Sequence, residues 1–196
     1  MNRVIASTIA GLSMSVVAAG TAFAGCPGPT PGNPPPPAPT KPAWQYINEP
    51  GEIPAGYACK DRILTRQSGH VREPYEITRN GKKYIVFEAD RDFKVSLYNP
   101  KTKKRIVKDS SGDFYDHLVK GGRDSESIGK GANFLFGKGI KGLLFLDGYQ
   151  KFYVKNYETP KQKITLQVVK GKYIELCAKL GSKPVNGKNP PPPPAP

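Results

Sequence analysis

The sequence predicts an all-β fold for residues 46–181: a single antiparallel β-sandwich or small β-barrel, closed by one disulfide and flanked by disordered proline-rich arms. Three observations predict it. Runs rich in β-branched and aromatic residues alternate with polar positions. Turn signals separate these runs. Two cysteines, Cys59 and Cys177, bracket most of the segment.

Strand-like runs recur at short intervals along this segment. Residues 63–65 form the first run, and residues 164–169 alternate apolar with polar side chains, as a strand with one buried face does. Between the runs lie dipeptides that favour turns, because Gly and Asn accept positive φ. The other runs are 84–87, 93–98 and 152–154, and the turn signals are Asn80-Gly81, Asn99-Pro100, Ser111-Gly112, Asp147-Gly148 and Lys170-Gly171.

Two hairpins are predicted from these signals. The first spans residues 76–85 around Asn80-Gly81, the preferred pair for a type I′ turn, since both central residues of that turn need positive φ. The second spans residues 166–176, with Lys170-Gly171-Lys172 as its turn. The best candidate for a helical turn is residues 115–119.

The cysteine positions predict one internal disulfide. Cys59 comes just before the first predicted strand, and Cys177 ends the last one. A bond between them would close nearly the whole domain into one loop, which the chain-entropy model values at about 4–5 kcal/mol. Two unpaired buried thiols would be unusual in an exported chain. We therefore expect Cys59 and Cys177 to be bonded.

Residues 1–24 have the pattern of a cleavable signal peptide: a positive charge on Arg3, an apolar uncharged stretch, and small residues before the cleavage site. Interrupting glycines and following prolines argue against a membrane anchor. Cys26 leaves two alternatives open. Its setting resembles a bacterial lipobox, in which case it would be lipidated and the domain tethered to the outer face of the membrane. Otherwise the protein is secreted with a third, unpaired cysteine.

Proline-rich segments lie on both sides of the predicted domain, at 25–45 and 182–196. Such runs lack amide donors and cannot bury a core, so they favour the extended polyproline II conformation. We interpret the first as a spacer that holds the domain away from a membrane or cell wall. The alternative is a docking ligand for a proline-binding partner.

The chain is strongly basic, with a net charge of +14. A surface of this charge attracts polyanions without a specific site. Candidate partners are anionic cell-wall polymers, an anionic lipid surface or an unknown protein, and specific recognition of nucleic acid is not expected. The alternative is a solvated face whose lysines guard edge strands against pairing. The candidate contacts are Lys101, Lys103, Lys104, Arg105, Lys138 and Lys141.

No catalytic site, metal site or cofactor is predicted. The chain has two histidines, and His117 lies beside Asp116 in the densest acid–base cluster. A hydrolase built on this pair would need a nucleophile, and the sequence has no Gly-x-Ser-x-Gly elbow. The spacing of histidines and cysteines does not suit zinc. Residues 109–113 lack the full ligand series of a calcium loop.

A family resemblance supports the predicted fold class and the predicted extracytoplasmic localisation. The segment Gly131-Ala132-Asn133-Phe134-Leu135-Phe136, between a Cys that precedes the first strand and a Cys that ends the last, resembles a group of small exported proteins of actinobacteria. The resemblance covers residues 59–177. The group is uncharacterised, so the resemblance implies an exported β-domain and no active site.

These features together lead to one functional hypothesis with two alternatives. We expect a non-enzymatic envelope or extracellular domain that contacts anionic surface polymers or a partner protein. One alternative is a hydrolase acting on the cell wall through Asp116 and His117. The other is a phage-encoded or secreted accessory factor that binds a host protein.

Overall fold

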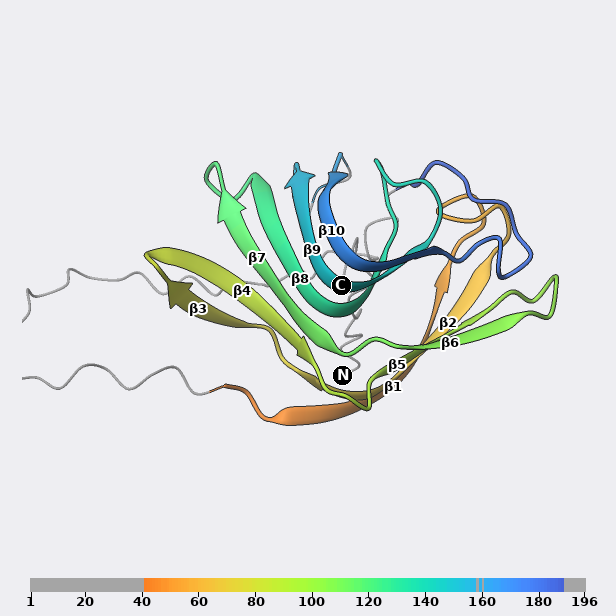
Figure 1. The fold of residues 1–196 in the computed structure, drawn as a ribbon, viewed down its shortest axis with the longest axis horizontal. Coiled ribbons are helices and arrows are strands. Elements are labelled where there is room, and N and C mark those ends of the chain that lie inside the picture. Colours follow the sequence, from red (N-terminus) through yellow and green to blue (C-terminus); the bar gives the residue numbers. More distant parts are fainter. Residues whose placement is uncertain (1–40, 158, 160, 189–196) are drawn as a thin grey trace, which may run out of the picture.

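The structure, a computed structural model, describes residues 41–157, 159 and 161–188 of the 196-residue chain (Figure 1). The regular elements of these residues are all strands, and every strand pair is antiparallel. The predicted all-β fold is therefore confirmed. The strands are β1 (Trp44–Ile53), β2 (Ile63–Arg72), β3 (Tyr75–Arg79), β4 (Lys82–Ala89), β5 (Lys94–Tyr98), β6 (Arg105–Asp109), β7 (Gly112–Val119), β8 (Asp124–Leu135), β9 (Leu144–Lys155) and β10 (Lys163–Glu175).

All ten strands belong to one sheet that bends over itself. Its main path runs β10-β9-β8-β7-β4-β2-β5-β6, while β1 pairs with β2 and β3 pairs with β4. Strands β8, β9 and β10 curve through a wide bend, and β1, β2, β5 and β6 form the other arm (Figure 1). One folded sheet thus does what the two sheets of a sandwich do, because its two arms enclose a shared core.

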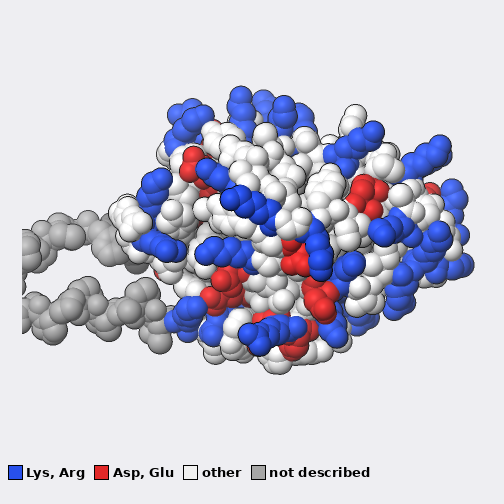
Figure 2. Space-filling view, viewed as in Figure 1, with Lys and Arg blue, Asp and Glu red and all other residues white. Residues whose placement is uncertain are grey.

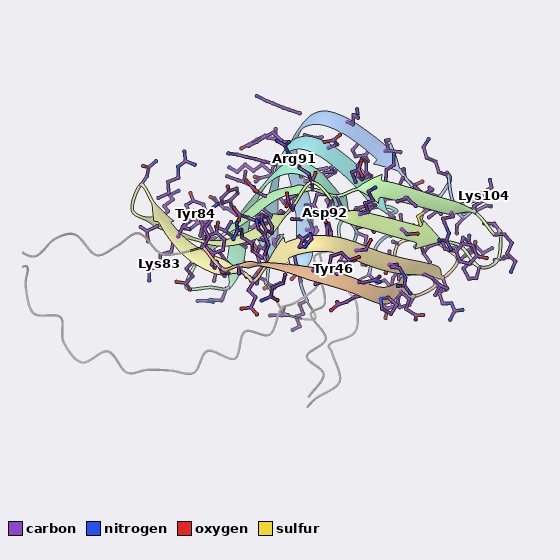
Figure 3. The ribbon with its side chains drawn as sticks, turned by 90° about the horizontal axis from the view of Figure 1, so that it is seen from below. Tyr46, Lys83, Tyr84, Arg91, Asp92 and Lys104 are labelled. Atoms are coloured by element: carbon purple, nitrogen blue, oxygen red, sulfur yellow. A yellow bond between two sulfur atoms is a disulfide. The ribbon has the colours of Figure 1, made fainter. Side chains whose placement is uncertain are left out.

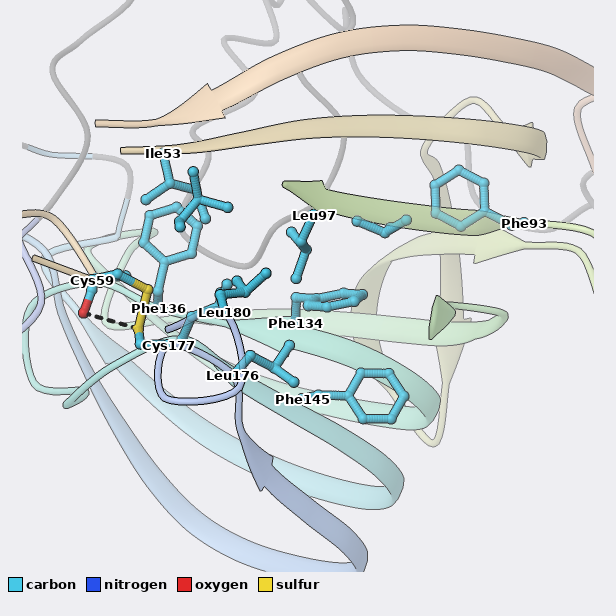
Figure 4. Packing of buried hydrophobic residues seen from close by; sticks show 14 of the residues in the cluster. Ile53, Cys59, Phe93, Leu97, Phe134, Phe136, Phe145, Leu176, Cys177 and Leu180 are labelled. Atoms are coloured by element: carbon cyan, nitrogen blue, oxygen red, sulfur yellow. Dashed lines mark hydrogen bonds between the residues drawn. A yellow bond between two sulfur atoms is a disulfide. The ribbon is translucent and has the colours of Figure 1, made fainter. Parts of the chain in front are cut away.

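The larger core cluster lies between the two arms. Ile53 and Leu97 come from one arm, Phe134 and Phe145 come from the other, and Leu180 follows the last strand (Figure 4). A second cluster, which includes Leu146 and Phe152, lies on the opposite face of the bent strands. Alternation within each strand sends neighbouring side chains to these two clusters.

The disulfide between Cys59 and Cys177 belongs to the larger cluster, and both of its residues are fully buried. The two Cα atoms lie 5.4 Å apart, across a sequence separation of 118 residues. This confirms the predicted pairing. The bond joins the loop between β1 and β2 to the end of β10, so it ties the two arms together (Figure 4).

A line of glycines marks the bend of the sheet. Gly112, Gly131, Gly148 and Gly171 are direct neighbours in register across β7, β8, β9 and β10. All four have positive φ, between 101° and 154°. A Cβ atom on Gly148 would lie 2.2 Å from the carbonyl oxygen of Lys170, and the other three positions are similarly tight against backbone. Glycine is therefore required where these strands bend.

This line corrects two sequence predictions. Lys170-Gly171-Lys172 is not a hairpin turn, because β10 continues through it as one strand. Asp147-Gly148 likewise lies inside β9. Glycine marks both chain reversals and bends within strands, and a single sequence does not distinguish the two. The predicted helical turn at 115–119 is also wrong, since these residues pair in β7.

The Asn80-Gly81 hairpin is confirmed. Its two central residues have φ of 51° and 71°, as a type I′ turn requires, and Arg79 pairs with Lys82 across the turn. The strand β1, by contrast, precedes the first predicted strand. Its Pro50 and Gly51 weaken the strand pattern, and they are tolerated because β1 pairs on one side only, with β2.

The folded part of the chain extends past the predicted domain boundary. Residues 182–188 hydrogen bond to the domain: the amide of Val185 donates to Ala58 O, and that of Lys188 donates to Tyr57 O. The predicted signal peptide, Cys26 and the prolines at 25–40 and 189–196 lie outside the described residues.

Candidate functional site

The acid–base candidates Asp116 and His117 point to opposite faces of β7, because neighbouring residues of a strand alternate. The Asp116 carboxylate is buried and accepts hydrogen bonds from Ser127 Oγ and from Tyr157 OH, the latter at 2.9 Å. The His117 ring lies on the other face, with Nδ1 2.8 Å from Lys83 O and its ring tilted by 40° against that of Tyr84. The structure does not bring the two side chains together.

Burial raises the pKa of Asp116 to about 6, although the hydrogen bonds from Ser127, Tyr157 and Ser125 oppose this shift. The group is therefore a buried carboxyl within a hydroxyl network. Its partners hold it in place, and the network supplies no base beside it. We interpret Asp116 as a structural group whose ionisation affects stability.

The second histidine makes a surface pair. His70 Nδ1 lies 2.7 Å from Asp92 Oδ2, and both side chains are nearly half exposed. The His70 amide also donates to Asp92, and these hydrogen bonds lower the pKa of the Asp92 carboxyl. Tyr46 contacts the His70 ring edge-on, with the ring centroids 5.3 Å apart. The pair links β2 to the turn before β5.

Metal-ligating side chains do not cluster: within the part of the chain that the structure describes, there is no group of three or more His, Cys, Asp or Glu placed to hold an ion. Asp90, at the turn before β5, accepts a hydrogen bond from the Arg91 amide through its own carboxylate.

Basic side chains do cluster, at the end of the molecule that holds the disulfide. We call this the disulfide end, and it consists of residues 58–62, 99–104, 136–142 and 176–188. Hydrogen bonds connect the four segments to one another. The Lys60 amide donates to Lys183 O at 2.8 Å, Thr102 Oγ1 donates to Leu180 O at 2.6 Å, and the Gly187 amide donates to Ile140 O at 2.7 Å.

The disulfide end has few acidic residues. Its one carboxyl is Asp61, whose pKa is lowered by hydrogen bonds from Ser182 and Lys101, and Lys101 Nζ lies 3.3 Å away. Glu175 borders the last segment, and its carboxylate accepts from the Cys177 amide. Lys and Arg side chains cover the right-hand end of the molecule in Figure 2. The basic residues of the four segments are Lys60, Arg62, Lys101, Lys103, Lys104, Lys138, Lys141, Lys179, Lys183 and Lys188.

Five of the six residues predicted to contact polyanions belong to this end. The sixth, Arg105, begins β6 and lies over the ring of Tyr98, 5.4 Å from its centroid. Five other basic residues of this end were not predicted, because they are spread along the chain: Lys60, Arg62, Lys179, Lys183 and Lys188. A signal for two of them existed. Lys60 follows Cys59 and Lys179 lies two residues after Cys177, so the predicted disulfide places both near one another.

Comparison with known proteins finds no matching family model and no significantly similar curated protein or solved structure. The resemblance to exported actinobacterial proteins therefore stays a prediction. A helix able to span a membrane is not found among the residues that the structure describes.

Proposed function

We propose that this protein is a non-enzymatic, extracytoplasmic binding domain whose disulfide end binds an anionic polymer of the cell envelope. The observation that carries the proposal is the gathering of ten basic residues and one carboxyl by four segments that are distant in the sequence. Like charges repel, so grouping these residues lowers the stability of the fold. Binding of an anionic partner offsets this cost.

Lysine suits this kind of partner. Nine of the ten basic residues are Lys, which binds phosphate as a compact point charge, whereas Arg is preferred where fixed two-point recognition is needed. A flexible phosphodiester polymer presents many equivalent charges, so a lysine-rich surface binds it without a shaped pocket. The disulfide is compatible with the oxidising space in which such polymers are found.

A charge-matched pair of variants tests the proposal. Lys60, Lys104 and Lys183, all exposed at the disulfide end, are changed to Gln in one variant. Arg79, Lys82 and Lys83, exposed at the β3–β4 turn, are changed to Gln in the control, which loses the same net charge. Lys83 and Lys104 lie at opposite ends of the molecule (Figure 3).

Binding to poly(glycerol phosphate) is measured as a function of salt. We expect the first variant to bind roughly tenfold more weakly at low salt, with a shallower salt dependence, because fewer counterions are released. The control should change much less. Equal losses in both variants would show that net charge alone drives binding and would contradict a site at the disulfide end. Vesicles of phosphatidylglycerol, tested in parallel, distinguish a lipid surface from a polymer.

Attachment to the membrane depends on Cys26, which lies outside the described residues. Intact mass spectrometry of the exported chain distinguishes the two alternatives. A diacylglycerol-modified Cys26 means a tethered domain. An unmodified chain that begins near Gly25 means a released one.

A further inference from the structure

A pocket lies where the two ends of the bent sheet face each other. Of the ten strands that the structure describes, β10 and β6 stand at the two ends of the main path, so no ladder of hydrogen bonds joins them. Both strands line the pocket, together with parts of β8 and β9, and its volume is about 310 Å³. The pocket thus occupies the gap that remains because the sheet stays open. We call it the β6–β10 pocket.

One side of the β6–β10 pocket is apolar. Phe145 and Ile174 line it from β9 and β10, and Ala132 lines it from β8. Phe145 belongs to the larger core cluster, and the other two residues pack against that cluster, so this wall is fixed in place. A cavity of about 150 Å³ encloses one benzene molecule. The β6–β10 pocket, at about 310 Å³, therefore has room for an apolar group the size of two fused rings.

Lys108 brings a positive charge into this pocket from β6. Exposed and partly buried residues alternate along β6, and Lys108 shares its face with Ile106, which packs against the core. Lys108 Nζ lies 5.1 Å from the centroid of the Phe145 ring. This ammonium group forms an ion pair with none of the carboxylates that the structure describes. A partly buried cation beside an apolar wall favours an anionic ligand, because a paired charge is less costly to bury.

The other charged residues of the lining do not neutralise Lys108. Asp147 and Lys172 are partners in register across β9 and β10, with Lys172 Nζ 3.8 Å from Asp147 Oδ2, so they balance each other. Asp109 also lines the pocket, but it is an exposed position of β6 and pairs with exposed Lys94 on the outer face of the sheet. The net charge that faces the pocket is therefore the single positive charge of Lys108.

We propose that the β6–β10 pocket binds a small aromatic carboxylate, with its ring system against Phe145 and Ile174 and its carboxylate at Lys108. The ammonium group would donate a charge-assisted hydrogen bond to the carboxylate, and the rings would leave water. Asp147 repels an anion, so the carboxylate is directed toward β6. No residue of this pocket belongs to the four segments of the disulfide end, so the site is separate from the proposed polymer-binding surface.

Two probes of nearly the same shape, 2-naphthoate and 2-naphthamide, test the proposal on the full mature chain. Only the first is charged. Binding is followed through amide resonances in ¹H–¹⁵N spectra. We expect 2-naphthoate to shift the resonances of Ala132, Phe145 and Ile174, and to bind roughly tenfold more tightly than the amide. Equal affinity for both probes, shifts confined to other residues, or no shift at all would each overturn the proposal.

Three variants locate the charge that the probe uses. Lys108→Gln should weaken the binding of 2-naphthoate roughly tenfold and leave that of 2-naphthamide nearly unchanged. Lys94→Gln is the matched control, because it removes the same charge from the outer face of the neighbouring strand, and it should change the affinity by less than about twofold. Asp147→Asn removes a competing carboxylate and should strengthen the binding of 2-naphthoate roughly threefold.

Equal weakening by the two lysine variants would show that net charge attracts the probe, and it would contradict a site at Lys108. A well-dispersed spectrum shows that each variant is folded. If Lys108→Gln does not fold, the comparison of the two probes on the unchanged chain still decides.

Discussion

Two aspartates show how single residues respond to their surroundings. Asp116 is buried among hydroxyl groups, and burial raises its pKa to about 6. The carboxyl of Asp124 accepts from Tyr153 OH, Lys120 Nζ and the Asn156 amide, and these contacts hold its pKa far below the usual range. Asp124 therefore stabilises the fold above the pKa of the unfolded chain, and this contribution is lost on acidification. Asp116 acts in the opposite direction.

The substitution Asp116→Asn tests the pH dependence of stability. The native state binds a proton at Asp116 more tightly than the unfolded chain does. Its contribution to stability is therefore complete below about pH 4 and is lost as pH rises through about 6, which amounts to about 3 kcal/mol. Asn keeps an acceptor for Ser127 and Tyr157 but does not ionise.

Urea unfolding at pH 4 and pH 7 gives the measurement. The unfolding free energy of the Asp116→Asn variant, taken relative to that of the unchanged protein, should be higher at pH 7 than at pH 4 by about 2 kcal/mol, because part of the contribution is already lost at pH 4. The reason is that only the unchanged protein loses the contribution of the protonated carboxyl over this range. A difference between the two proteins that does not depend on pH would contradict the assignment.

At the scale of elements, the bend in β7 to β10 depends on the glycine line. Each of the four glycines faces the backbone of its neighbouring strand, so a side chain at any of them meets a carbonyl oxygen that cannot move without breaking the ladder. The bend in turn lets one arm of the sheet cover the other, and it shapes one wall of the β6–β10 pocket.

Gly148→Ala should destabilise the protein by about 2–4 kcal/mol, because it combines positive φ with a Cβ placed 2.2 Å from Lys170 O. Gly122→Ala is the matched control. Gly122 has a φ of 83° but no atom near its Cβ position, so this change should cost about 1 kcal/mol. Denaturant unfolding compares the two, and equal losses would mean that space at the bend is unimportant.

At the scale of the whole molecule, the disulfide joins the two arms and organises the basic end. Cys59 and Cys177 lie in the main core, and the segments that follow each of them carry part of the disulfide end. Stability and the proposed binding surface therefore depend on the same bond.

Replacing both Cys59 and Cys177 with Ala should lower the unfolding free energy by about 2–5 kcal/mol, because the unfolded chain regains the freedom that the bond removes from a long loop. Denaturant unfolding with and without reductant provides the check. Reductant should destabilise the unchanged protein and leave the variant unaffected. An unchanged unfolding midpoint in the variant would show that core packing alone holds the arms together.

Local chemistry allowed several features to be predicted from the sequence. Asn80-Gly81 specifies its turn because both residues accept the φ values that the turn needs. Alternating side chains indicated β5 and β10, and the cysteines indicated their own pairing. The β6–β10 pocket was not predictable, because Lys108 and Phe145 meet only when the two arms of the sheet fold over each other.

The sequence by itself thus determined the β-class of the domain, its tight hairpin and its disulfide, since each depends on residues whose chemistry is local or unique in the chain. Tertiary structure decided that Gly148 and Gly171 bend strands and do not reverse the chain, that β1 forms, and that Lys60, Lys104 and Lys183 share one surface. The physical reason is that these outcomes depend on backbone hydrogen bonds between distant segments, whose partners are set only when the sheet is assembled.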